Sequence, residues 1–111
     1  MKTKLITIFF VFFVLVGANA NAFEYVGPGK ITYLENGWFG EGVALHLDKG
    51  TSGCPAMDID FGIPSDHPSF KEMTALATSA FLASANVELV VDVGNCVFGS
   101  RTKILAIRLL K

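Results

Sequence analysis

The chain has 111 residues, 51% of them hydrophobic, with nine basic residues against ten acidic ones and a formal charge of −1. A protein that binds nucleic acid needs a basic footprint to displace counterions from phosphates. The basic residues near the end of the chain are few and spread along one expected strand; they are Arg101, Lys103, Arg108 and Lys111. We therefore expect no nucleic-acid partner.

Residues 1–22 have the pattern of a secretory signal peptide. Met1–Lys4 is basic, Leu5–Val16 is apolar, and Ala20 and Ala22 each end a small-residue cleavage motif. The apolar run of about twelve residues is shorter than the roughly twenty that span a bilayer. We expect cleavage after Ala20 or Ala22 and a bacterial domain, residues 23–111, that is periplasmic or secreted without stable membrane insertion. A retained amphipathic anchor is the alternative.

Removal of this leader leaves seven basic against ten acidic residues, a formal charge of −3. The remaining domain of about ninety residues is near the size at which a single core gives marginal stability, so a covalent brace is useful. In an exported protein, Cys54 and Cys96 are expected to form a disulfide. The bridge closes a loop of about 43 residues and is worth roughly 4 kcal/mol. No CxxC spacing or neighbouring histidine indicates zinc, so we expect no metal and no cofactor.

The first half of the domain reads as strands. Gly27-Pro28-Gly29 predicts a turn, and a strand follows over 30–35. Asn36-Gly37 is typical of a two-residue hairpin with a type I′ turn, leading to a strand over 38–48 whose apolar residues alternate. After a loop over 49–55, a strand over 56–63 places Met57, Ile59, Phe61 and Ile63 inside and turns Asp58 and Asp60 outward together.

The second half adds one helix and two strands. Ser69-Phe70-Lys71-Glu72 is a capping box, followed by a helix over 70–84 with an apolar stripe at period 3.6. Strands are expected over 87–93, ending at the Gly94-Asn95 turn, and over 103–110, where apolar residues on both faces predict cover on both sides. The order β-β-β-α-β-β with one disulfide predicts a mainly β domain, a five-stranded OB-like Greek-key barrel with the helix at one mouth. An unrelated α+β sandwich is the alternative.

Several segments resemble the small exported B-subunits of subtilase- and pertussis-type toxins. The residues that carry the resemblance are Cys54, Asp58–Ile63, Pro68–Lys71, the alanine-rich helix, Val87–Val93 and Cys96, within the span from Cys54 to Ile107. The resemblance implies a single OB-type domain with a disulfide, assembly into a pentameric ring, a catalytic partner chain and binding of sialylated or related glycans. The glycan-contacting serine, aspartate and tyrosine residues of that family have no counterparts that can be placed here, so no receptor site is carried over.

Aromatic residues supply the binding hypothesis. Tyr33, Trp38 and Phe39 gather at the first hairpin, with Tyr25 just before it. Aromatic faces stack on sugar rings, and barrel hairpins often present them; core packing is the competing interpretation, above all for Trp38. We expect a non-enzymatic exported domain that binds a glycan or a protein, with a homo-oligomer as the assembly that a toxin-type subunit would form. A monomeric periplasmic interaction protein is the alternative.

Catalytic chemistry has one candidate set. His46, on the outward face of its strand, can approach Asp58 or Asp60 across the sheet, which suits a general base, a small hydrolase or a weak metal site. Outward polar residues on an alternating strand give the same pattern. His67, between Asp66 and Pro68, is expected to be an ordinary loop residue, and no nucleophile elbow or phosphate-binding loop is present. We therefore expect no enzyme activity.

Overall fold

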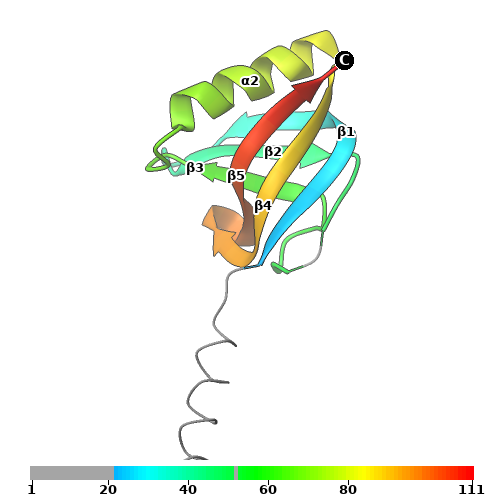
Figure 1. Ribbon diagram of the computed structural model, residues 1–111. Helices are drawn as coiled ribbons and strands as arrows, with labels where there is room; N and C mark the ends of the chain where they lie inside the picture. Colours follow the sequence, from blue (N-terminus) through cyan, green and yellow to red (C-terminus); the bar gives the residue numbers. More distant parts are fainter. Residues whose placement is uncertain (1–21, 52) are drawn as a thin grey trace, which may run out of the picture.

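The computed structural model describes residues 22–51 and 53–111 (Figure 1). The predicted signal peptide, apart from Ala22, lies outside these residues. In the part of the chain that is described, no helix has the length and apolar character needed to cross a membrane.

Five strands form a closed ring with one helix across an end of it (Figure 1). The elements in chain order are β1 (Phe23–Asn36), β2 (Gly42–Leu47), β3 (Asp60–Pro64), α2 (Phe70–Ala83), β4 (Asn86–Val97), a 3₁₀ turn (Phe98–Ser100) and β5 (Arg101–Leu110). Around the ring the strands follow the order β1-β2-β3-β5-β4, and only the β3–β5 pair is parallel. The OB-like barrel is confirmed, and the α+β sandwich alternative is wrong because the β1–β4 pairing closes the sheet into a single barrel.

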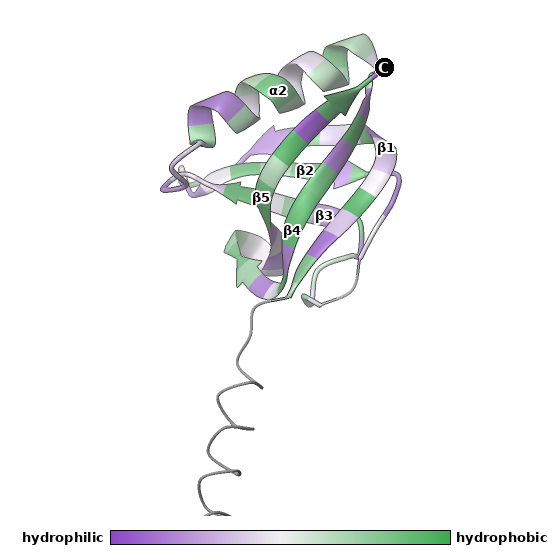
Figure 2. Cartoon of the chain, in the orientation of Figure 1, coloured by the Kyte–Doolittle hydropathy of each residue, from purple (hydrophilic) through white to green (hydrophobic). Residues whose placement is uncertain are grey.

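Alternating apolar residues of the strands fill the barrel, and one face of α2 closes it. Figure 2 shows hydrophobic and hydrophilic residues interspersed along β4 and a mostly hydrophobic upper part of β5. The helix contributes Met73, Ala77 and Ala80 to the same core. The largest fully buried side chains are Phe61, Leu45, Leu47, Ile63, Leu89, Ile104, Val87 and Val91. The period-two pattern identifies the inward face of β4 correctly. On β2 it is right for Leu45 and Leu47, but Ala44 is also buried and Val43 is only half-buried.

The helix has the expected bounds, but the predicted capping box is wrong. The Ser69 side chain makes no cap hydrogen bond, because its backbone at φ −106° and ψ 28° is not in the extended region that aims a hydroxyl at the helix-start amides. The Ser69 N–H instead donates to His67 Nδ1 at 3.0 Å. His67, expected to be an ordinary loop residue, thus organises the entry to α2.

The first hairpin is also different from the prediction. β1 and β2 are joined by a five-residue connection, Gly37–Glu41, in place of a two-residue type I′ turn. Positive φ occurs at Gly40 (78°) and Gly42 (156°). The Glu41 carboxylate accepts the Phe39 N–H at 2.6 Å, so a side chain satisfies an amide that would be unpaired in a longer loop. This contact, together with the Gly37 N–H that donates to the Gly42 carbonyl at 2.7 Å, stabilises the longer connection.

β1 and β3 begin at other residues than predicted, because pairing with strands distant in the sequence determines where they start. β1 begins at Phe23, before the expected turn, since Phe23–Val26 pairs with β4. β3 begins only at Asp60, so Met57 is exposed and Asp58 lies in the preceding turn. Asp58 and Asp60 therefore do not share an outward face.

The last two strands are longer than expected, and β5 is less covered. β4 continues past Gly94-Asn95 to Val97, and β5 begins at Arg101 after a single 3₁₀ turn. The prediction that both faces of β5 are covered is wrong: Ala106 and Arg108 are exposed. The β4–β5 register shifts between Val90, which pairs with Ala106, and Val91, which pairs with Ile104. One residue of β5 is left over at this shift, so the residues before and after it alternate out of phase. The apolar residues over 103–110 therefore form a run instead of a regular alternation.

The predicted disulfide is present. Cys54 and Cys96 are joined with 5.6 Å between their Cα atoms, inside the range for unstrained bridges. The bond ties the loop before β3 to the far end of β4. It fixes one end of the connection that leads into β5.

Replacing Cys54 and Cys96 together by serine is expected to lower the free energy of unfolding by about 2–5 kcal/mol, because the unfolded chain regains the entropy of a long open loop. Urea unfolding of the oxidised protein and the variant measures the change. Wild-type protein held in reductant is the control and should unfold with the variant. Coincident curves for the oxidised protein and the variant would show that the bridge does not brace the domain.

Candidate functional site

The connection between β4 and β5 lies over the outer face of β2 and β3. In OB-type barrels, ligands bind on this face and at the neighbouring β1–β2 and β4–β5 loops. Here the Phe98 ring lies against two strand glycines. A Cβ on Gly42 would be 2.7 Å from Phe98 Cε1, and a Cβ on Gly62 would be 3.3 Å from the same atom. Because these positions have no side chain, the ring packs directly on the sheet and takes up part of the face that an open barrel offers to a ligand.

Arg101 holds the connection in this position. Its Nε–H donates to Asp60 Oδ1 at 2.7 Å, and one Nη–H group reaches Glu35 Oε1 at 3.5 Å. A second Nη–H donates to the Phe98 carbonyl at 3.4 Å, while the guanidinium carbon lies 5.4 Å from the centre of the Phe98 ring, within cation–π range. Asp60 is only 9% exposed, so this guanidinium compensates a largely buried carboxylate.

A second set of contacts extends the network along β1 and β2. The Tyr33 ring lies 4.7 Å from the His46 ring, centre to centre. The Tyr33 hydroxyl donates to Glu35 Oε2 at 2.7 Å. This hydrogen bond raises the pKa of Tyr33 above its ordinary value of 10.0, and partial burial and the charge of Glu35 add to the effect. The hydroxyl thus donates to one oxygen of the Glu35 carboxylate.

A cleft of about 220 Å³ lies between the β1–β2 and β4–β5 connections. Its lining residues are Glu35, Gly37, Trp38, Phe39, Glu41, Phe98, Gly99 and Arg101. Trp38 and Phe39 are each 87% exposed, so neither belongs to the core. The cleft thus combines two free aromatic faces with charged groups that are fixed by the Arg101 network.

The structure separates the aromatic residues that the sequence suggested. Trp38 and Phe39 line the cleft, and the core-packing interpretation of Trp38 is wrong. Tyr33 does not line it, but it holds Glu35, which does. Tyr25 lies on the β1–β4 seam opposite Val90.

Sequence reasoning missed Phe98, Arg101 and both glutamates of the cleft. In the sequence, Arg101 is one of four basic residues spread along an expected strand, and nothing marks it as different from the other three. The available signal was a glycine inside each of two strands, Gly42 and Gly62, since a strand glycine often marks close approach by another part of the chain. The two glycines indicate that another segment packs on β2 and β3, but they do not identify that segment.

The candidate catalytic set is only partly assembled. His46 Nε2 lies 3.5 Å from Asp60 Oδ1, as the strand pairing allows, but Asp58 is in a turn outside this group. The same Asp60 oxygen accepts the Arg101 Nε–H at 2.7 Å. Within residues 22–51 and 53–111, no three His, Cys, Asp or Glu side chains converge as a metal site would require.

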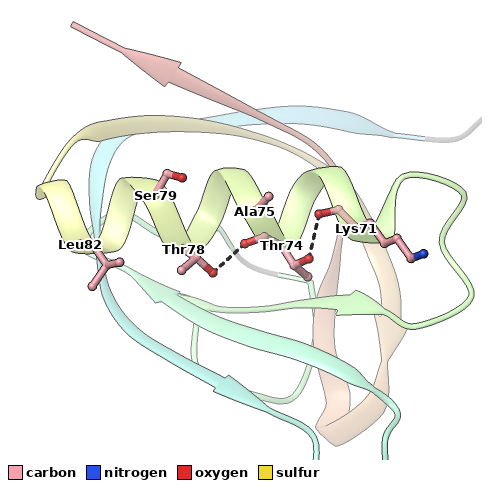
Figure 3. Close-up of a pocket in the computed structure, with 6 residues that line it drawn as sticks. All are labelled: Lys71, Thr74, Ala75, Thr78, Ser79 and Leu82. Atoms are coloured by element: carbon pink, nitrogen blue, oxygen red, sulfur yellow. Dashed lines mark hydrogen bonds between the residues drawn. The ribbon is translucent and has the colours of Figure 1, made fainter.

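A second hollow lies on the exposed side of α2 (Figure 3). It is lined by Lys71, Thr74, Ala75, Thr78, Ser79 and Leu82. The Thr74 and Thr78 hydroxyls donate to helix carbonyls, of Lys71 at 3.0 Å and of Thr74 at 2.8 Å. The hollow is open and has few free polar groups, so the cleft is the better candidate for a ligand.

In comparisons with known proteins, no family model, no curated protein and no solved structure matches the chain. The resemblance to toxin B-subunits over Cys54 to Ile107 stays a prediction from the residues quoted above.

Replacing Gly62 by alanine is expected to destabilise the domain by about 1–3 kcal/mol, as overpacking does elsewhere. The new Cβ would lie 2.8 Å from Val97 Cγ2 and 3.3 Å from the Phe98 ring, so the connection must lift. Denaturant unfolding measures the loss. Gly40→Ala is the control for local displacement, because its Cβ would meet nothing within 4 Å. Its φ of 78° brings a cost of about 1–2 kcal/mol of its own, so the two variants are compared through the amide shifts of residues 97–101, which should change with Gly62→Ala alone. Amide shifts of residues 97–101 that change with Gly40→Ala and not with Gly62→Ala would contradict this packing.

Replacing Arg101 by alanine is expected to cost about 2 kcal/mol of unfolding free energy, between the values for exposed and buried ion pairs. The Arg101 and Asp60 side chains are 19% and 12% exposed, so water compensates Asp60 only in part after the guanidinium is lost. Arg101→Lys should recover part of the loss, because one ammonium group cannot replace the three-way contact of the guanidinium. Unfolding curves that are identical for wild type and Arg101→Ala would show that the network does not hold the connection.

Proposed function

We propose that residues 23–111 form a non-enzymatic, exported glycan-binding domain whose ligand enters the cleft between the β1–β2 and β4–β5 connections. The observation that carries the proposal is the exposure of Trp38 and Phe39 beside fixed polar groups. Two large aromatic side chains at 87% exposure carry a solvation cost that a bound ligand would remove. A partner must therefore present a matching apolar face and polar edges.

A sugar ring has this combination. One face of a pyranose is lined by C–H groups that pack on an aromatic ring, while its hydroxyls take hydrogen bonds from the edge. The cleft of about 220 Å³ is smaller than the roughly 300–1,000 Å³ of pockets for drug-sized ligands. It suits a single sugar residue of a longer chain that continues over the rim.

Two further observations support an exported binding domain. The disulfide is the type of bond that persists in oxidising compartments, and the leader pattern agrees with it. The resemblance to toxin B-subunits favours carbohydrate as the ligand and assembly as a homo-oligomer with a catalytic partner chain. The mildly acidic composition argues against nucleic acid as the ligand of this barrel.

A monomeric interaction protein is the second candidate. Phe23 and Tyr25 lie two residues apart at the start of β1 and are both exposed. Such a pair on one side of a strand can contact another protein through the sheet rather than a sugar through the cleft. Light scattering of the mature domain distinguishes a ring from a monomer.

Because Trp38 is the only tryptophan, its fluorescence reports ligand binding directly. We expect a glycan that binds on an array to shift the Trp38 emission to shorter wavelength, since stacking removes water from the indole. Trp38→Ala should abolish at least 90% of the array signal, as the loss of a central aromatic contact costs about 2 kcal/mol or more.

The matched control is Phe23→Ala, which removes an exposed aromatic side chain at the other end of β1 and should leave glycan binding unchanged. Undiminished binding by Trp38→Ala, with loss in Phe23→Ala, would move the ligand to the β1–β4 seam. Absence of any carbohydrate ligand from a broad array would overturn the glycan proposal.

A further inference from the structure

We propose that the cleft selects a cationic amino sugar, a hexosamine with an unsubstituted amine, over sialylated and other anionic sugars. This inference rests on the proposed glycan-binding function and specifies its ligand. The argument comes from the charges on the walls of the cleft and from which of them are already paired.

The charged residues that line the cleft are two carboxylates and one guanidinium: Glu35, Glu41 and Arg101. Asp60 lies directly behind Arg101, at 2.7 Å from its Nε. Together these four groups have a net negative charge. Lys103, two residues further along β5, does not line the cleft, so it does not offset this charge at the ligand.

The guanidinium is already partly engaged, since three of its five N–H groups contact acceptors of this chain. Each of its three nitrogens contacts an acceptor, in Asp60, Phe98 or Glu35. The Phe98 ring lies against its face. A sugar carboxylate could reach only the remaining N–H groups of Arg101, and it would lie beside the carboxylates of Glu35 and Glu41 while doing so. An anionic sugar is therefore disfavoured in this cleft.

The carboxylates, in contrast, can take further donors. A carboxylate accepts at about four lone-pair positions. Glu41 uses Oε1 for the Phe39 N–H at 2.6 Å, and Glu35 takes one hydrogen bond at each oxygen, from Tyr33 and Arg101. An ammonium group between them would form charge-assisted hydrogen bonds.

The aromatic residues favour a sugar as the carrier of that ammonium group. Trp38 and Phe39 line the same cleft, and each is 87% exposed. A pyranose packs its C–H face on such a ring, and its amine adds a cation–π contribution. A flexible lysine side chain has the charge but not the flat apolar face, so it would leave at least one ring uncovered.

Calorimetric titration with two matched oligosaccharides tests the proposal. The ligands are the β-1,4-linked tetramers of glucosamine and of N-acetylglucosamine, which differ only in the charge and acetylation of the amine. Sialyllactose is the anionic comparison. At about pH 6, where carboxylates are ionised and the sugar amine carries charge, and at low ionic strength, we expect the glucosamine tetramer to bind about tenfold more tightly than its acetylated form, since two exposed ion pairs each contribute a factor of a few. Sialyllactose should bind more weakly than both tetramers.

Two variants that remove the same charge at different places distinguish a preference set by the cleft from a general attraction to the acidic domain. Glu41→Gln can still accept the Phe39 N–H, and we expect it to reduce the tenfold preference to about threefold while binding of the acetylated tetramer persists. Glu72→Gln removes the same charge from the exposed surface of α2 and should leave the preference unchanged. An equal loss of preference in both variants would show attraction to net charge and would overturn the proposal.

The remaining outcomes distinguish a failure of the amino-sugar preference from a failure of the glycan-binding function on which it rests. Equal affinity for the two tetramers, or tighter binding of sialyllactose, would overturn the amino-sugar preference and leave glycan binding intact. If none of the carbohydrates binds, the glycan-binding proposal fails, and the preference fails with it. Tighter binding of a tetralysine peptide than of the glucosamine tetramer would assign the acidic cleft to a protein partner.

Discussion

The contact of Arg101 with Asp60 is the interaction on which the candidate site depends. At 2.7 Å, it joins the first residue of β5 to the first residue of β3, the two strands that run parallel and complete the ring. The same side chain supports the Phe98 carbonyl and ring. Without this contact, a buried carboxylate loses its compensating charge and the wall of the cleft loses its support.

The disulfide and the Arg101 network brace the same short segment from its two ends. Cys96 is bonded to Cys54, and the backbone carbonyl of Ser100 accepts the Ala56 N–H at 3.1 Å. Between them the chain turns with positive φ at Gly99 (65°) and Ser100 (59°). A segment with this many constraints presents its side chains in one arrangement, which lowers the entropy cost of binding a rigid ligand such as a sugar. Trp38 and Phe39, on the opposite connection, supply the contact area.

The sequence predicts what local patterns determine. Alternation over Val87–Val93, the period of the helix and the cysteine pair lead to the correct barrel, helix bounds and disulfide. The sequence does not predict features that depend on contacts between residues far apart in the chain. The Asn36-Gly37 pair does not form the tight turn, and the longer connection is held by contacts that include the bond between Glu41 and Phe39. Asp60, expected to be an outward polar residue, is largely buried against an arginine 41 residues away. Trp38 and Phe39 were recognisable from the sequence, whereas the charged wall facing them was not, because its members come together only when the ring closes.

The central claim is that a sugar binds between the two connections, against Trp38 on one side and the Arg101 network on the other. Titration of the ¹⁵N-labelled mature domain with the glucosamine tetramer, followed by NMR, tests it most directly. The account predicts that the Trp38 indole N–H and the Arg101 Nε–H resonances shift together and saturate with one affinity, while those of the α2 surface stay in place. Saturable shifts confined to α2 or to the β1–β4 seam, with both side-chain signals unmoved, would contradict it.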